Sequence, residues 1–414
     1  MLTALAATPD QGGAVLIAVE SFAILLGIAA LVALVARRIN LPYSVALVLV
    51  GLAVSVVTPA ASVQISPQLV LVVLLPGLVF EAAYQMDVRE LRRSFGWVVV
   101  LAAPGVLVSA AIVAIVLHAA TGLPLEVAFV VGAIVSATDP VAVVATFRRL
   151  RTPARLTTLV EAESLFNDGT AIVVFFIALN AVSGSVTLAD GVVGFAVTVI
   201  ASAVIGGVAG LVASRVIVRV DDHLIELTIS VVLAYGTYLV ADELHLSGII
   251  ATVVAGAMFG SYGRQIGMSK RTEEALDLVW EFIAFILNAI AFLLIGLAMH
   301  VSDLSAALPA IAWGVVAILV GRALVIYGLL GLPARLAHTT AGTAAIPRRW
   351  LHVLFWAGLR GAVAVALALS LPLDFPQRGL VQGIVFGIVL FTLLVQGTTT
   401  GILVRRTGLQ DDGA

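Results

Sequence analysis

The chain has 414 residues, of which 61% are apolar and 11% are charged, whereas a soluble globular domain has about 45–50% apolar and about 25% charged residues. A mean hydropathy of +1.16 excludes an ordinary soluble enzyme and predicts an integral membrane protein, because most of the chain would otherwise expose apolar surface to water. The formal net charge is only −2 and Cys is absent, so we expect no nucleic-acid partner, no disulfide and no thiolate metal site.

Apolar runs bounded by charged, Pro or Gly residues predict thirteen membrane-spanning helices. Most of these runs match the roughly 17–25 residues that are needed to cross about 30 Å of hydrocarbon. The predicted spans are residues 13–36, 42–57, 67–85, 95–117, 125–147, 157–181, 189–218, 223–241, 246–262, 275–299, 305–330, 350–372 and 379–404.

The basic residues test this count, because Arg and Lys concentrate in cytoplasmic loops and should therefore occupy alternate loops. Nineteen of the 22 basic residues follow odd-numbered spans; Arg378 lies in an opposite loop, and Arg322 and Arg360 lie inside spans. The sequence therefore predicts a multi-pass protein of the cell membrane, with its N-terminus outside and its C-terminus in the cytoplasm.

An odd number of spans makes the two halves of the chain face opposite ways across the membrane. This is the arrangement of transporters built from inverted repeats. We predict a single transporter domain with a first six-helix repeat over residues 1–181, a linker helix over 182–222 and an inverted second repeat over 223–414.

The fifth span of each predicted repeat is interrupted near its middle. The interruptions are Ser136-Ala137-Thr138-Asp139-Pro140 and Gly358-Leu359-Arg360-Gly361. Pro lacks an amide N–H, and paired glycines permit unwinding. Backbone groups freed at this depth persist only beside a cavity or inside the protein, so matching breaks indicate a transport site.

Six ionisable side chains stand out because they lie deep within the predicted spans. Each costs at least about 2.5–3.5 kcal/mol near the bilayer centre and is a functional hypothesis for that reason. They are Glu81, Asp139, Glu163, Asp168, Arg322 and Arg360. Carboxylates outnumber guanidiniums, which favours a cation as the cargo, and carboxylate, hydroxyl and carbonyl oxygens are hard ligands that suit such ions.

The sixth span carries the densest polar group. On a helix, Glu163 and Asn167 are four residues apart, as are Ser164 and Asp168, so the spacing predicts one polar patch with Asp168 near mid-membrane. A carboxylate in a poorly hydrated cavity can hold Na⁺ or a proton but not both, which suffices for coupled exchange. Asn167 takes up no proton, so a single cycling carboxylate predicts one-for-one, electroneutral exchange.

An ion gradient is the expected energy source. The only Lys, Lys270, lacks the spacing of a nucleotide-binding Walker loop. We therefore expect no nucleotide, no cofactor and no enzymatic activity, with the monovalent cation, the proton and the lipid bilayer as the partners.

The chain resembles the cation/proton antiporter superfamily, specifically the sodium/proton exchangers of the bacterial NhaP and animal NHE type. The matching motifs are Ala137-Thr138-Asp139-Pro140, Glu161-Ala-Glu163-Ser164-Leu165-Phe166-Asn167-Asp168-Gly169 and Gly358-Leu359-Arg360-Gly361-Ala362. The Asn-Asp pair is specific, since electrogenic relatives carry Asp-Asp there. With the thirteen spans, the resemblance covers essentially the whole chain and implies the NhaA-like antiporter fold with crossing broken helices.

The resemblance implies a role for each matching residue. Asp168 is the expected ion- and proton-binding carboxylate and hence the Na⁺ ligand. Ser164, the Thr138 backbone carbonyl and Glu81 are expected to help coordinate the ion.

Supporting roles follow from the same resemblance. Asn167 and Asp139 are expected to pair with the half-helix ends where the broken spans cross. Glu163 is expected to form an ion pair with a basic residue of the eleventh or twelfth span, either Arg322 or Arg360. The resemblance further implies a homodimer in which a six-helix core moves, like an elevator, against a dimerisation domain.

Several alternative functions also fit these residues. K⁺/H⁺ exchange is the nearest one, because cavity dimensions set the preferred ion radius. A passive cation channel would also place carboxylates in the membrane. An intramembrane aspartyl protease would use two facing Asp, but its usual Gly-x-Gly-Asp motif is missing.

The motif Gly206-x-x-x-Gly210 in the seventh span favours close packing within one subunit over a dimer face.

Overall fold

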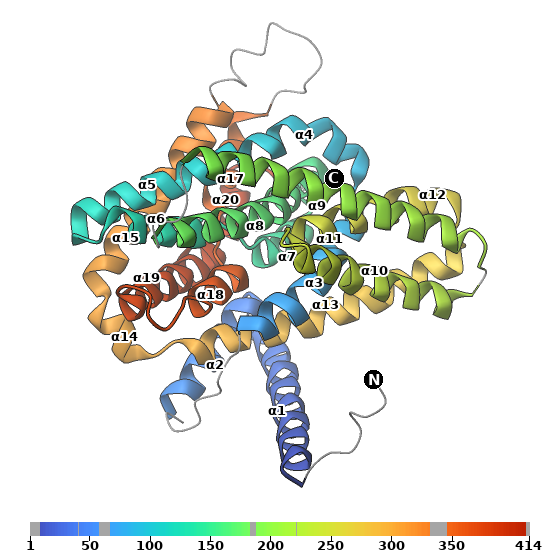
Figure 1. Cartoon of the computed structure of the whole chain (residues 1–414), viewed down its shortest axis with the longest axis horizontal. Helices are drawn as coiled ribbons and strands as arrows, with labels where there is room; N and C mark the ends of the chain where they lie inside the picture. The colour runs from blue at the N-terminus through green and yellow to red at the C-terminus, as the bar shows by residue number, and fades with distance from the viewer. Residues whose placement is uncertain are drawn as a thin grey trace, which may run out of the picture.

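The computed structural model describes residues 9–39, 41–57, 67–182, 188–220, 222–331 and 346–410, and every regular element within them is a helix (Figure 1). The α-helices and the π-helical turns (η) are α1 (Pro9–Ile39), α2 (Tyr43–Val57), η2 (Leu69–Leu74), α3 (Leu75–Gln85), α4 (Val88–Ala102), α5 (Pro104–Thr121), α6 (Leu125–Ile134), α7 (Val141–Leu150), α8 (Ala154–Val182), α9 (Leu188–Ile217), α10 (His223–Glu243), α11 (Gly248–Met258), η3 (Phe259–Gly263), α12 (Arg264–Ile266), α13 (Lys270–Ala298), α14 (Val301–Ala306), α15 (Leu308–Ala323), η4 (Leu324–Leu330), α17 (Arg348–Trp356), α18 (Ala362–Leu369), α19 (Arg378–Phe391), η6 (Thr392–Gly397) and α20 (Thr398–Arg406).

Short polar side chains mark where several helices begin. Asp87 accepts hydrogen bonds from the first amides of α4, and Asp222 does the same for α10. Ser247 and Ser269 cap α11 and α13 in the same way. Gly122 ends α5 in the left-handed region, at φ 72°. These caps satisfy amides that a helix leaves unpaired at its first turn, and Gly adopts the left-handed turn without a Cβ penalty.

Helices lie at the predicted spans. Among the described residues, seven are long and apolar enough to cross a membrane, namely Val88–Thr121, Ala154–Val182, Asp190–Ile217, His223–Glu243, Lys270–Ala298, Leu308–Leu330 and Arg378–Arg406. The fourth span is longer than predicted and begins at Val88 rather than residue 95, because Asp87 caps it there. The count of thirteen crossings and the inverted repeats stay predictions.

Both predicted breaks are present. Residues 135–140 separate α6 from α7, and residues 357–361 separate α17 from α18. The two breaks meet, because the backbone amide of Asp139 donates to the carbonyl of Leu359 at 2.8 Å. Two unwound segments from distant parts of the sequence therefore share backbone hydrogen bonding in the protein interior.

The packing of the helices divides the described residues into two bundles. The first bundle contains α1, α2, α3, α9, α10, α11 and α13, which contact one another extensively. The second contains α4 to α8, α15 and α17 to α20. In Figure 1, α10 and α12 lie on the right and α5, α15 and α19 on the left. Contacts between the bundles are sparser and run mainly from α8 and α18 to α3, α9, α11, α13 and η2.

Glycines allow the closest helix contacts inside the first bundle. A Cβ at Gly206 of α9 would meet the carbonyl oxygen of Ala251, and one at Gly210 would lie 2.9 Å from that of Ala255. Both partners belong to α11 of the same chain. The Gly206-x-x-x-Gly210 pattern therefore packs within one subunit, which confirms the reading favoured from the sequence.

We expect Gly206→Ala to lower the melting temperature of the detergent-purified protein, because the added methyl meets backbone atoms that have no rotamer by which to move away. Overpacking of this kind costs about 1–3 kcal/mol. Gly207→Ala is the matched control, since its Cβ would meet only a Val254 methyl at 3.9 Å. Tryptophan fluorescence during heating measures both. Equal melting temperatures for the two variants would contradict the packing argument.

Candidate functional site

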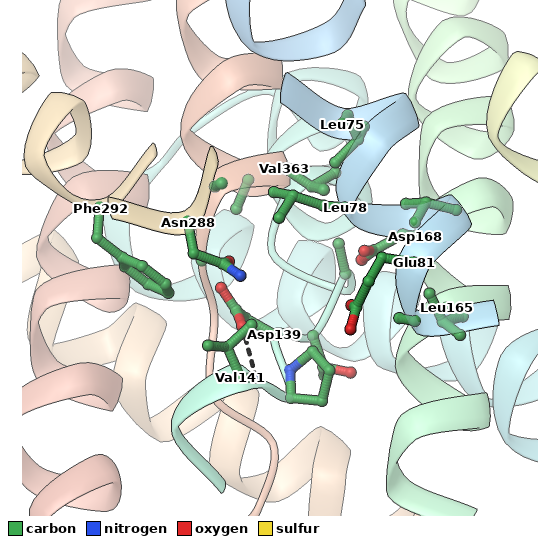
Figure 2. A pocket seen from close by; sticks show the side chains of 18 residues that line it. Leu75, Leu78, Glu81, Asp139, Val141, Leu165, Asp168, Asn288, Phe292 and Val363 are labelled. Atoms are coloured by element: carbon green, nitrogen blue, oxygen red, sulfur yellow. Dashed lines mark hydrogen bonds between the residues drawn. The ribbon is translucent and has the colours of Figure 1, made fainter. Parts of the chain in front are cut away.

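A cavity of about 100 Å³ lies between the two bundles, where α3 and α13 of the first face α8, the α6–α7 break and α18 of the second. Most of its wall is apolar, with Leu75, Leu78 and Phe292 among the lining side chains. Figure 2 shows the carboxylates of Glu81, Asp139 and Asp168 pointing into this space. The sequence-predicted acidic residues are thus brought together, apart from Glu163.

Asp168 lies at the middle of α8 and is 8% exposed. Among the described residues, its Oδ1 has no hydrogen-bond partner. A buried carboxylate oxygen that lacks a partner is costly in a medium of low dielectric constant. A monovalent cation or a proton at this oxygen would remove the cost, and either would fit the cavity.

Thr138 fastens the α6–α7 break to α8. Its backbone amide donates to Asn167 Oδ1 at 3.3 Å, and Asn167 Nδ2 donates to Thr138 Oγ1 at 2.7 Å. The hydroxyl of Ser164 lies 2.9 Å from the same Oγ1. Thr138 lines the cavity, whereas Ser164 lies behind it. Ser164 therefore supports the break in this structure, and its side chain does not form part of the cavity wall.

Asp139 is held at the beginnings of two half-helices. Its Oδ1 accepts a hydrogen bond from the amide of Val141, at the start of α7, at 2.9 Å (Figure 2). It also accepts one from the amide of Ala362, at the start of α18. Gly361 permits this approach, because a Cβ there would overlap the Asp139 carboxylate. A negative charge between two helix N-termini is favourable, since both dipoles point their positive ends at it.

Two arginines lie at the C-terminal ends of the other two half-helices, α6 and α17. Arg360 donates from Nη1 to the carbonyls of Ser136 and Ala137, just after α6, at 2.8 and 3.0 Å. Arg322 donates from Nη2 to the carbonyl of Leu354, in the last turn of α17, at 2.8 Å. Positive charge is favourable at these ends because they leave carbonyls unpaired.

The partner of Glu163 is Arg322, which settles the alternative that the sequence leaves open. Arg322 Nη2 lies 3.0 Å from Glu163 Oε2, and Nη1 contacts Oε1. Both side chains are buried, and with Arg360 they line a small space apart from the Asp168 cavity. The one polar patch predicted on α8 is therefore split, with Glu163 facing Arg322 and Asp168 facing the ion-sized cavity.

Glu81 reaches the cavity from α3, on the opposite wall to the break. The charged side chains that interact electrostatically with Glu81 are Arg148, Glu161, Glu281 and Asp277. Arg148 Nη2 lies 3.3 Å from Glu161 Oε1. Since Arg148 lies in the last turn of α7 together with Arg149, Glu81 lies toward the arginine-rich end of the molecule.

Asn288 of α13 lines the same cavity and was missed in the sequence analysis. Asn288 is neither ionisable nor part of one of the motifs that mark the transport site. The available signal was a lone amide in an otherwise apolar stretch of the tenth predicted span.

A family model described as the transmembrane sodium/hydrogen exchanger matches residues 25–406. This chain belongs to the sodium/hydrogen exchanger family. Among related proteins, the low-affinity Na⁺/H⁺ antiporter NhaS1 of Synechocystis sp. is 38% identical over 404 residues, covering 95% of this chain and 75% of the relative. The Na⁺/H⁺ antiporter NhaH of Halobacillus dabanensis is 36% identical, covering 93% and 97%.

The fold agrees with a solved exchanger structure. The sodium proton antiporter MjNhaP1 from Methanocaldococcus jannaschii superposes with a TM-score of 0.77, at 19% identity, over 95% of this chain and 99% of the other. This likeness confirms the predicted all-α antiporter fold with broken helices. Family membership also confirms that the chain is a membrane transporter rather than an enzyme.

We expect Arg322→Met to destabilise this family member by about 3–5 kcal/mol, because Glu163 would keep a buried charge without a partner. The double variant Glu163→Leu with Arg322→Met should regain most of the loss, although the carbonyl of Leu354 still lacks its donor. Arg93→Met, in the exposed pair with Glu90, should cost about 1 kcal/mol or less. Thermal unfolding compares the variants. A double variant no more stable than Arg322→Met would show that the pair is not the reason.

Proposed function

We propose that this chain is a secondary active transporter that exchanges Na⁺, or Li⁺, for H⁺ across the membrane, one ion for one proton. The observation that carries the proposal is the unpartnered Oδ1 of Asp168 in an ion-sized cavity between two helix bundles. A volume of about 100 Å³ lies below the roughly 300–1,000 Å³ of sites for organic ligands. Family membership and relatives named Na⁺/H⁺ antiporters support the same substrates.

Competition for Asp168 couples the two fluxes. A Na⁺ ion entering the cavity displaces the proton from the carboxylate, and a proton arriving from the other side displaces Na⁺. Either ion neutralises the carboxylate, whereas the empty carboxylate stays charged. Carrying that charge past the apolar wall is unfavourable, so the site changes sides only when it is loaded.

We propose the following ligands for the cation. Asp168 supplies the charge, and the backbone carbonyl of Thr138 and the carboxylate of Glu81 border the same cavity. Ser164 takes part only after its hydroxyl turns away from Thr138. Such oxygen ligands suit a hard monovalent cation, and the exchange requires no further cofactor.

The proposed stoichiometry follows from the roles of the neighbouring residues. Asn167 binds no proton, and the Asp139 carboxylate is already engaged by backbone amides at two helix N-termini. We therefore assign the alternation between ions to Asp168 alone. One cation replaces one proton at a single site, so no net charge crosses the membrane in a full cycle.

Alternating access would arise from movement of the second bundle against the first. We propose an elevator-like motion, with the site facing the arginine-rich side in the conformation seen here.

We further propose that two chains form a homodimer and that the protein lies in the cell membrane with its N-terminus outside and its C-terminus in the cytoplasm. The basic residues of alternate loops support this orientation.

K⁺/H⁺ exchange is the nearest alternative, because carboxylate and carbonyl ligands do not by themselves select an ion radius. Proteoliposomes containing a pH dye and exposed to Na⁺, Li⁺ or K⁺ over a range of pH distinguish the two. Proton movement driven by Na⁺ and Li⁺ supports the proposal. Movement driven by K⁺ alone would replace it with the alternative.

We expect Asp168→Asn to abolish Na⁺-driven proton movement in such proteoliposomes, because the amide neither releases a proton nor supplies the charge. Glu126→Gln removes an exposed carboxylate at the start of α6 and should transport like the wild type. Both variants should match the wild type in yield and melting temperature. Transport that persists in Asp168→Asn would remove the central residue from the mechanism.

We also expect the exchange rate to stay nearly constant when a membrane potential is imposed with valinomycin and a K⁺ gradient. Movement of one net charge would be worth about 2.3 kcal/mol per 100 mV, and a rate-limiting step of that kind would respond strongly. The control holds the potential at zero with equal K⁺ on both sides. A clear voltage dependence would argue against one-for-one exchange.

A further inference from the structure

Asn288 is a polar side chain in the cavity to which the mechanism above gives no role. It lies in α13 within the otherwise apolar stretch 282–298. It lines the cavity, and its amide makes no hydrogen bond to any described residue. Asn288 is half-buried, so its amide is accessible from the cavity and is free to bind an ion or a water there.

The position of Asn288 sets it apart from most cavity ligands. Asp168, Asp139 and Thr138 belong to the second bundle, whereas Asn288 belongs to α13 of the first. Glu81 is the other polar side chain that the first bundle contributes to this cavity. Figure 2 shows the Asn288 amide pointing into the cavity, across from Glu81. Whether Asn288 contacts a bound ion therefore depends on the position of the second bundle relative to the first.

We propose that the amide oxygen of Asn288 is a side-specific ligand of the transported cation, binding it directly or through a water that the cation carries. The amide acts when the site faces the arginine-rich side and is lost when the second bundle carries Asp168 to the opposite side. This inference rests on the proposed function, because it requires a moving carboxylate and a static amide.

Removing a ligand that exists in one orientation weakens cation binding in that orientation alone. A variant cannot change the overall equilibrium of the exchange reaction. The equilibrium between the two orientations of the cation-loaded protein must therefore shift toward the opposite orientation, by the same factor by which cation binding is weakened. A residue that only supported the fold would instead affect the two faces alike.

The test measures the KM for Na⁺ separately at each face. Everted membrane vesicles expose the face that carries Arg148 and Arg149, and right-side-out vesicles expose the other face. A pH dye inside reports Na⁺-driven proton movement in both. The variants are Asn288→Ala and Asn288→Leu, the second of which keeps the volume but removes the amide. Leu278→Ala, at an exposed position of the same helix, is the control.

We expect both Asn288 variants to raise the KM for Na⁺ at the Arg148 face by roughly 3- to 10-fold, the effect of one lost neutral interaction. The KM at the opposite face should stay within about twofold of wild type, and Asn288→Gln, which restores an amide, should recover part of the loss. Leu278→Ala should leave both values unchanged.

Other results would overturn the inference. Equal changes at both faces would make Asn288 a structural residue, and unchanged KM values would exclude it as a ligand. If Asn288→Ala and Asn288→Leu fail to fold while Asn288→Gln folds with wild-type KM values at both faces, the amide acts in folding and the inference is wrong. The proposed function fails separately, if the wild type itself shows no Na⁺-driven proton movement.

Discussion

Charge compensation at four helix ends in the protein interior is the constraint on which the site depends. Where α6 and α17 end and α7 and α18 begin, amides and carbonyls are left without helical partners, in surroundings without bulk water. Asp139 satisfies both beginnings, while Arg360 and Arg322 satisfy the two ends. The bond from the Asp139 amide to the Leu359 carbonyl holds the crossing together. Because the breaks are stabilised in this way, unwound backbone can border a cavity where an unbroken helix would present only side chains.

The carboxylates around the crossing differ in role because they differ in surroundings. Asp139 accepts hydrogen bonds from backbone amides, and Glu163 pairs with Arg322, so both carboxylates have partners within the protein. Of the carboxylates described around the crossing, only Asp168 combines burial with an oxygen that has no partner among the described residues. The same difference weakens the aspartyl protease alternative, in which two carboxylates must share one proton. The carboxylate of Asp139 is already engaged by two helix N-termini.

Sequence reasoning predicted the helices, the two breaks and the acidic residues near them, because hydropathy and Gly or Pro positions act locally. It could not choose between Arg322 and Arg360, since both are basic residues in neighbouring spans and helical spacing gives a face but no partner. For the same reason it placed Glu163 and Asp168 in one patch, although different helices cover the two sides of α8. Asn288 was missed because a single amide hardly changes the hydropathy of its span. These details depend on tertiary packing, which the spacing of residues along the sequence does not determine.

The division into two bundles explains why coupling needs no further device. In the proposed elevator-like motion, the Asp168 carboxylate moves with the second bundle, while the apolar side chains of α3 and α13, such as Leu78 and Phe292, belong to the first. When the carboxylate is empty, sliding it along this wall removes a charge from water without compensation, which is costly. When it holds Na⁺ or a proton, the same movement transfers a neutral group. In this proposed mechanism, the barrier to slippage and the barrier to exchange differ in the occupancy of the Asp168 carboxylate, so the difference in desolvation sets how tightly the two fluxes are coupled.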